Sequence, residues 1–189
     1  MAASGRRMGE SIVRRGVREE VNVIKGIPTT YEGVNFRSRT EAAFAAFFER
    51  VGWNWEYEPV DLEGYIPDFI VRFPAGPLLL EIKGPVEEVA LAESKVEVSG
   101  WNREALILCA PNRTPEVGRL LEWHDGEPLW GQAELFRCLS CGEVSVLCRE
   151  LSWRCRACGD GWGNAHVGDY DPAEDWAHAC NRVQWRAAV

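Results

Sequence analysis

Apolar and polar residues alternate through the middle of the chain in blocks that predict a helix, three strands, a second helix and a fourth strand. Ala and Phe recur at helical spacing across residues 37–51, and Gly52 ends this pattern. The other elements are expected as strands at residues 54–60, 66–73, 78–83 and 104–110 and as a helix at residues 86–100. A helix between the last two strands can form a crossover, so we expect an α/β fold whose mixed α+β sheet has its fourth strand parallel to a neighbour.

The pattern changes toward the C-terminus. Residues 111–134 are polar and loop-like, with a short helix expected in "TPEVGRLLEWH". From residue 135 onward, short alternating segments surround pairs of cysteines, and residues 171–187 predict a final helix with Asp171 as its N-cap. The expected units are a basic N-terminal segment at 1–30, a main domain at 31–134 and a cysteine-rich unit at 135–189.

The composition is that of a folded protein with one core of ordinary size. The chain has 189 residues, of which 46 % are hydrophobic, and it has no apolar run of the roughly 18 residues that a membrane span needs. Its N-terminus lacks the apolar centre of a signal peptide, and its cysteines number seven, an odd count that suits a reducing compartment. We expect a soluble, cytoplasmic protein with no membrane partner.

Charge is unevenly distributed along the chain. The net charge is −8, which argues mildly against a nucleic-acid partner. Residues 1–30 nevertheless carry six basic and three acidic residues, whereas residues 31–134 carry nine and nineteen. The basic N-terminus is either a solvated leader or an arm that touches phosphate, and the acidic middle is where a metal site would find carboxylates.

Three charged residues interrupt two of the predicted strands in "YIPDFIVRFPAGPLLLEIKGP". Side chains alternate along a strand, so Glu81 and Lys83 project to one face while Ile82 points into the core. Asp68, near the start of the preceding strand, can approach Glu81, and two carboxylates that close repel each other unless a cation lies between them. Such oxygen-rich sites suit Mg²⁺ or Mn²⁺, toward which the backbone carbonyl of Ile82 can also turn.

The spacing of these residues resembles the motif of the PD-(D/E)XK nuclease superfamily, because "PD" is followed by twelve residues and then by "EIK". The order of predicted elements is similar to that superfamily's restriction-endonuclease-like core, and the segment before "PD" resembles phage-type members. The likeness covers about residues 31–110. It implies that Asp68 and Glu81 bind the metal. It also implies that Lys83 positions or polarises the attacking water and that Glu41 supports the metal directly or through water.

Each of these residues also has a plain structural interpretation. Asp68 and Glu81 can be solvated strand ends, and Lys83 can be a surface lysine. Glu41 fits a capping box in "SRTE", with Ser38 as the N-cap residue, and this would account for Glu41 without catalysis.

Several basic residues have two interpretations each. Arg37 and Arg39 precede the first helix, where they either meet phosphate with help from the helix N-terminus or lie on the surface. Lys95 is on the second helix, which in this superfamily can add a basic residue to the site; alternatively it lies on a solvated helix face. Arg154 and Arg156 either contact a nucleic-acid backbone or pack the cysteine-rich unit against the main domain.

Four cysteines form the pattern C-x2-C-x13-C-x2-C, with a glycine directly after each pair. Four thiolates make a tetrahedral Zn²⁺ site with no open position, so we expect one structural zinc per chain in a unit that resembles a zinc ribbon. The expected ligands are Cys138, Cys141, Cys155 and Cys158. The other cysteines, Cys109, Cys148 and Cys180, are expected as buried thiols, and His166 is a rival metal ligand.

These observations predict a Mg²⁺- or Mn²⁺-dependent nuclease that hydrolyses phosphodiester bonds, with DNA as the expected substrate and RNA as the alternative. The ribbon would grip or select the substrate or stabilise the fold, and a homodimer is one arrangement that would cut two strands. A catalytically inactive nucleic-acid-binding module and a protein-interaction module on the same fold are the competing hypotheses. The resemblance also raises a phage, prophage or mobile-element origin, with the cytoplasm of a bacterial or phage-infected host cell as the location.

Overall fold

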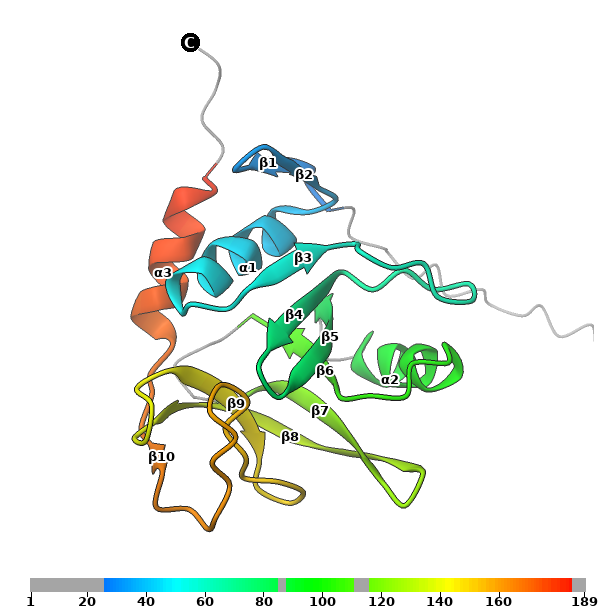
Figure 1. Cartoon of the computed structure of the whole chain (residues 1–189). Helices are drawn as coiled ribbons and strands as arrows, with labels where there is room; N and C mark the ends of the chain where they lie inside the picture. Colours follow the sequence, from blue (N-terminus) through cyan, green and yellow to red (C-terminus); the bar gives the residue numbers. More distant parts are fainter. Residues whose placement is uncertain (1–25, 85–87, 111–115, 185–189) are drawn as a thin grey trace, which may run out of the picture.

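A curled sheet with helices on both faces forms the body of the protein (Figure 1). The computed structural model describes residues 26–84, 88–110 and 116–184. The helices in these ranges are α1 (Arg39–Arg50), α2 (Val89–Val98) and α3 (Ala173–Arg182). The strands are β1 (Thr29–Tyr31), β2 (Val34–Phe36), β3 (Trp55–Tyr57), β4 (Phe69–Phe73), β5 (Gly76–Lys83), β6 (Ala105–Cys109), β7 (Glu116–His124), β8 (Glu127–Cys138), β9 (Val144–Cys148) and β10 (Val167–Gly168).

Eight of the described strands form one sheet in the order β10-β8-β7-β6-β5-β4-β3, with β9 paired to β8. β5 and β6 run parallel, and the other strand pairs within the described ranges are antiparallel. α2 connects β5 to β6, so the expected crossover and the parallel fourth strand are confirmed. The architecture is therefore mixed α+β.

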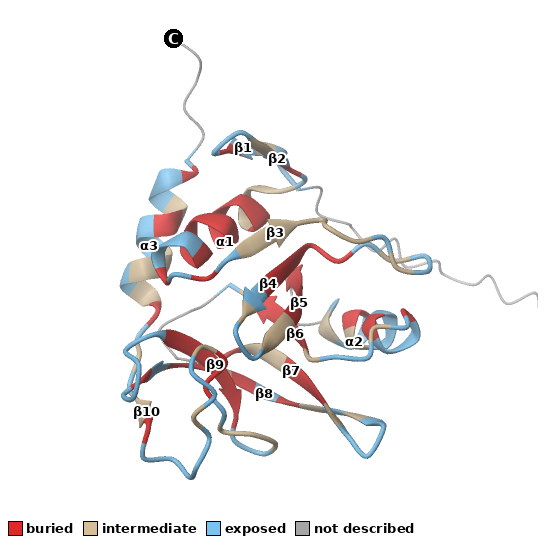
Figure 2. Ribbon diagram, viewed as in Figure 1, coloured by how far each residue is buried: buried red, intermediate tan, exposed pale blue. Residues whose placement is uncertain are grey.

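The core lies chiefly between α1 and the sheet. α1 begins after Ser38, whose hydroxyl oxygen accepts the backbone N–H of Glu41 at 3.1 Å. Its alanines and phenylalanines are buried, as Figure 2 shows by the red of this helix. Phe44 also contacts Trp176 of α3, with ring centroids 4.6 Å apart. α1 is thus covered by the sheet on one side and by α3 on another.

The two faces of β5 belong to different clusters. Leu80 and Ile82 join the core under α1, whereas Leu79 packs with Val96 of α2. Because side chains alternate along a strand, Glu81 lies on the α2 face.

The helix expected within residues 114–124 is wrong. Residues 116–124 form β7, and β8 returns antiparallel after a two-residue turn at Asp125 and Gly126. Both turn residues have positive φ, 52° and 86°, as a type I′ turn requires, and Asp-Gly is the favoured sequence for this turn. The apolar residues of "VGRLLEWH" are compatible with a helix or a strand. The hairpin turn at Asp125 and Gly126 favours the strand, because it lets β8 pair with this segment.

β8 passes through residue 134, where the boundary of the main domain was expected, so the cysteine-rich unit shares a strand with the main sheet. The final helix is present as α3, and the N–H of Ala173 donates to Asp171 Oδ1 at 2.9 Å, although Pro172 takes the N-cap position.

The basic residues of the expected N-terminal segment lie outside the described residues. Within the described part of the chain, no helix combines the length and apolar character needed to cross a membrane.

Candidate functional site

Asp68 and Glu81 face each other across two neighbouring strands. β4 and β5 pair antiparallel with Phe69 opposite Leu80, and Asp68, just before β4, continues this register toward Glu81. Residues opposite each other on antiparallel strands share one face, with Cβ atoms about 5 Å apart. Both acids are nearly fully buried, with 5 % and 6 % of the residue exposed. The sheet therefore holds two carboxyl groups together and out of water.

Asp68 accepts two hydrogen bonds. Arg37 Nη2 lies 2.5 Å from its Oδ1, and the backbone N–H of Ile82 donates to its Oδ2 at 2.7 Å. Burial, followed by the charge of Glu81, nevertheless raises the pKa of Asp68 to about 7. A positive charge nearby stabilises the ionised form of a buried carboxyl group that lies beside a second one.

Glu81 is held by one residue of its own strand and by one from a distant loop. Lys83 Nζ lies 2.6 Å from Glu81 Oε1, so the two side chains project to the same face, as alternation along β5 predicts. Tyr65, in the loop between β3 and β4, donates its hydroxyl to Oε2 at 2.7 Å. Burial and then the charge of Glu81 raise the pKa of Tyr65, so the hydroxyl keeps its proton and remains a donor.

Glu41 caps its own helix and also faces Asp68. Its Oε1 accepts the Ser38 hydroxyl at 2.7 Å, while its Oε2 accepts the Tyr57 hydroxyl at 2.6 Å and the backbone N–H of Arg37 at 3.1 Å. The expected capping box thus forms, with the N–H of Arg37 in place of that of Ser38. The charge of Glu41 also adds to the effects that raise the pKa of Asp68, of which burial is the largest. Glu41 therefore caps the N-terminus of α1 and also lies close enough to Asp68 to affect its pKa.

A cavity of about 1260 Å³ opens over these side chains. It lies between the start of α1, the loop before β4, the end of β5 and α2. The predicted site residues that line it are Arg37, Glu41, Asp68, Glu81, Ile82, Lys83 and Lys95. Arg39 is not among them, and its Nε is buried with no hydrogen-bond partner in the described part of the chain.

Sequence reasoning missed the two tyrosines that hold these acids. Tyr57 is the last residue of β3, in the alternating segment "WNWEYEP". This alternation indicates that Tyr57 and Trp55 lie on the same face of the strand, and it is the signal that could have drawn attention to Tyr57. Tyr65 closes a short turn in which its backbone pairs with that of Leu62. No local pattern marks Tyr65, since only the path of the loop brings it to Glu81.

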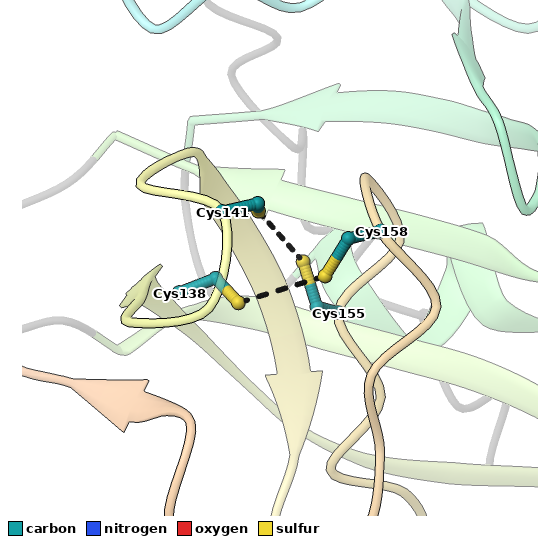
Figure 3. A group of neighbouring side chains, drawn as sticks. All are labelled: Cys138, Cys141, Cys155 and Cys158. Atoms are coloured by element: carbon teal, nitrogen blue, oxygen red, sulfur yellow. Dashed lines mark hydrogen bonds between the residues drawn. The ribbon is translucent and has the colours of Figure 1, made fainter.

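The four predicted zinc ligands converge in space (Figure 3). Their sulfur atoms all lie within 4.8 Å of one another, with Cys138–Cys158 at 3.8 Å and Cys141–Cys155 at 3.9 Å. Four sulfurs about 2.3 Å from a tetrahedral zinc stand about 3.8 Å apart, so this group has the size that zinc requires. Among the His, Cys, Asp and Glu side chains of the described residues, no other group of three or more is this close, and His166 is not a member.

Two glycines close the loops that carry these cysteines. Gly142 and Gly159 have φ values of 82° and 80°, and their N–H groups donate to the carbonyls of Cys138 and Cys155 at 2.7 and 2.8 Å. This backbone conformation favours glycine over any residue with a Cβ. Burial opposes ionisation of Cys138, but hydrogen bonds from the loop, led by the N–H of Cys141, lower its pKa to about 7. Burial, in contrast, raises the pKa of Cys141 to about 12 and raises that of Cys155, so of these three thiols only Cys138 is favoured as the thiolate, which is the form that binds metal.

Arg156, which follows Cys155 of the cysteine cluster, is buried against the main sheet, with 1 % of the residue exposed. Its guanidinium contacts Glu104 at 2.9 Å, Glu122 at 3.3 Å and the carbonyl of Val146. Of the two interpretations of Arg156, this burial favours the one in which its side chain packs the cysteine-rich unit against the main domain. Arg154 shares Glu104 at 2.9 Å but keeps 44 % of its side chain exposed.

The second cysteine pair and the acidic cavity lie toward opposite ends of the β4–β5 hairpin. The carbonyl of Arg156 accepts the N–H of Ala75 in the hairpin turn at 3.2 Å, whereas Asp68 and Lys83 mark the other end. β5 has eight residues, so these two ends are roughly 25 Å apart at about 3.3 Å per residue. The cysteine cluster is therefore not a wall of the acidic cavity.

Comparisons with known proteins found no family model, no curated protein and no solved structure that matches this chain. Proposals about its function rest on the acidic cavity and the cysteine cluster themselves.

Proposed function

We propose that this protein is a metal-dependent nuclease that hydrolyses phosphodiester bonds, with DNA as the substrate and RNA as the alternative. The observation that carries the proposal is the pair of buried acids, Asp68 and Glu81, opposite each other and beside Lys83 in one cavity. The order helix, three strands, helix and parallel strand also supports a PD-(D/E)XK site on a restriction-endonuclease-like core.

The donor set suits Mg²⁺ or Mn²⁺. Both acids offer oxygen ligands, and the raised pKa of Asp68, caused first by burial and then by Glu81, is that of a group that gains from a nearby cation. Asp68 and Glu81 would hold the ion, with the backbone carbonyl of Ile82 as a further ligand and Glu41 as support. A bound ion of this kind lowers the pKa of its water and offsets negative charge on the phosphate.

Basic side chains of the cavity would handle the substrate. Lys83, tied to Glu81 at 2.6 Å, would orient the attacking water and stabilise charge that develops at the phosphate. Lys95 lines the same cavity from α2 and would contact a neighbouring phosphate.

Zinc bound by the four cysteines would be structural. The group offers four thiolates and no open position, and Glu81 stands six residues, roughly 20 Å, from the hairpin turn that contacts Arg156 beside Cys155. The ribbon would therefore act on stability, or on parts of the substrate far from the scissile bond.

A nucleic-acid-binding module without cleavage is the second candidate. It is favoured by the ion pairs of Arg37 with Asp68 and of Lys83 with Glu81, because these pairs already offset the charge of both acids. Such a module would bind a strand in the same cavity and leave it intact.

A cleavage assay separates the two candidates. Zinc-loaded protein is incubated with plasmid, single-stranded DNA and RNA in Mg²⁺ or Mn²⁺. We expect cleavage by the wild type and a loss of at least about a hundredfold in Asp68→Asn and Lys83→Ala. Glu56→Gln is the matched control, since Glu56 is an acid of the neighbouring strand with 43 % of its side chain exposed. Binding without cleavage in either metal would contradict the nuclease and favour the module.

A further inference from the structure

We propose that Arg37 competes with the divalent cation for Asp68 and, once displaced, contacts the substrate phosphate. This inference rests on the proposed function, because it concerns the regulation of the same site. It would give Arg37 one defined role, a phosphate contact that metal binding makes available.

Arg37 already holds one of the two oxygens of Asp68. Its Nη2 lies 2.5 Å from Oδ1, while the backbone N–H of Ile82 occupies Oδ2 at 2.7 Å. The N–H of Ile82 belongs to β5 and is fixed by the sheet, whereas the side chain of Arg37 is 57 % exposed. Oδ1 is therefore the oxygen whose partner can change.

A divalent cation bound at Oδ1 would stand within a few ångströms of the Arg37 guanidinium. Like charges at that distance repel, and the burial of Asp68 limits the screening by water. The other charged groups that act on Asp68 are the acids Glu81 and Glu41 and the ammonium of Lys83, which is held by Glu81. The acids favour a doubly charged ion over a single guanidinium charge, so metal binding would drive Arg37 away from Asp68.

Glu58 gives Arg37 a second anchor. Arg37 Nε lies 2.7 Å from Glu58 Oε1, and its backbone N–H donates to Glu41 Oε2 and to the Tyr57 hydroxyl oxygen, both at 3.1 Å. The backbone of Arg37 is thus fixed at the cavity wall, and its guanidinium can leave Asp68 while it keeps a carboxylate partner.

The displaced guanidinium would remain at the cavity, next to the N-terminus of α1. A guanidinium presents a planar set of N–H donors that matches the oxygens of a phosphate, and it is always charged. Metal binding and phosphate binding would therefore be linked through Arg37. The substrate phosphate would take over the guanidinium that the metal releases.

Direct titration with Mn²⁺ tests the competition. The zinc-loaded, full-length wild type is compared with Arg37→Gln, Arg37→Lys and Asp68→Asn, with free Mn²⁺ followed by electron paramagnetic resonance. Arg72→Gln is the matched control, because Arg72 also pairs with an acid and is 53 % exposed but does not line the cavity. Thermal unfolding of each variant without Mn²⁺ verifies that it is folded.

We expect Arg37→Gln to bind Mn²⁺ about tenfold more tightly than the wild type. Arg37→Lys keeps the charge and should stay close to the wild type, and Arg72→Gln should not change the affinity. An unchanged or weaker affinity in Arg37→Gln, together with lost binding in Asp68→Asn, overturns the competition and leaves the metal site intact. If Asp68→Asn binds Mn²⁺ as tightly as the wild type, Asp68 is not a metal ligand, and both the proposed function and this inference are wrong.

A second measurement uses the wild type alone. Phenylglyoxal modifies accessible arginines, and mass spectrometry locates the modified residues. We expect Mn²⁺ to increase the modification of Arg37 severalfold and to leave Arg72 as it was. Modification of Arg37 that does not respond to Mn²⁺ overturns the proposal even where Arg37→Gln fails to fold.

Discussion

Glu81 depends on two donors that reach it by different routes. Lys83 follows on the same strand, whereas Tyr65 comes from a loop 16 residues earlier. Only 8 % of the Glu81 side chain is exposed at the cavity that it lines, so water replaces a lost donor less well than it would at the protein surface. A lost donor therefore leaves a buried carboxylate oxygen without a partner, which costs more than the net gain from an ordinary hydrogen bond.

Tyr65→Phe should lower the free energy of unfolding by about 1–3 kcal/mol, because it removes the partner of Glu81 Oε2 without changing the ring. Tyr31→Phe is the control. Tyr31 donates to Glu49 at 2.6 Å, but the Glu49 side chain is 35 % exposed and can bind water instead, so the loss should stay below about 1 kcal/mol. Urea denaturation followed by tryptophan fluorescence measures both, and equal losses would contradict the role given to burial.

At the scale of single residues, the sequence marks the acids and their basic partners Lys83 and Arg37, but not the tyrosines that also hold the acids. Asp68 and Glu81 stand out because a charge inside an apolar strand is unusual, and alternation along the strand then sets the face of Glu81. Tyr65 has no such mark, since its contact depends on the path of a loop. Arg156 resembles a surface cation in sequence because the nearest of the acids that bury it, Glu122, is 34 residues away.

The β7–β8 hairpin extends the sheet beyond the four strands that the sequence pattern predicts, and its fit against β6 depends on Gly118. A Cβ added there would lie 1.8 Å from the carbonyl oxygen of Ile107, and Gly118 has a φ of 148°. The pairing register with β8 also shifts between Glu116 and Gly118, as at a β-bulge. A glycine at this point therefore permits the close approach of β7 to β6.

Gly118→Ala should destabilise the protein by about 3 kcal/mol or more, because its Cβ would meet backbone atoms that cannot turn aside as a side chain can. Gly126→Ala is the control. Gly126 has a φ of 86°, but apart from its chain neighbours no atom of the described residues lies within 4 Å of the Cβ that alanine would add. Backbone strain alone should cost about 1–2 kcal/mol there. Chemical denaturation measures both losses. Similar values would mean that β7 can shift and that the close contact is not limiting.

Elements with a clear apolar period are predictable from this sequence, down to the three-residue β3, whereas ambiguous segments and the two-residue β10 are not. Residues 37–51 repeat at helical spacing over several turns and form α1. The apolar residues of β7 fit a helix and a strand equally, so the deciding signal was the dipeptide at Asp125 and Gly126, which lies outside the apolar run. β10 has two residues and therefore no period at all.

Across the whole molecule, Arg156 connects the second cysteine pair to the main sheet. Arg156→Ala would leave Glu104 and the buried Glu122 without this partner, and we expect a loss of about 3–5 kcal/mol in the free energy of unfolding. Arg154→Ala is the control, because Arg154 also pairs with Glu104 but is 44 % exposed, and it should cost about 1 kcal/mol at most. A loss in Arg156→Ala no larger than in Arg154→Ala would show that the buried contacts add little.

Several connections tie the cysteine cluster to the sheet, among them β9, which follows the first cysteine pair and pairs with β8, so we expect both to unfold together. β8 runs from the sheet into Cys138, and Arg156, beside Cys155, leads back to the sheet. Removal of zinc by a chelator under reducing conditions should therefore lower the melting temperature of the whole chain. Each kcal/mol lost shifts the melting temperature of a chain of this size by about 2–4 °C, so a loss of several kcal/mol should lower it by roughly 10 °C.

Calorimetry of the zinc-loaded and zinc-free protein distinguishes a coupled ribbon from an independent one. A coupled ribbon gives one transition that moves as a whole, because the free energy of zinc binding is shared by every element that unfolds with the cluster. Native mass spectrometry should count one zinc per chain, lost in Cys155→Ser and kept in Cys180→Ser, since Cys180 lies outside the cluster. An unchanged main transition after zinc removal would mean that the sheet is stable without the ribbon, and the shared strand β8 would then carry no coupling.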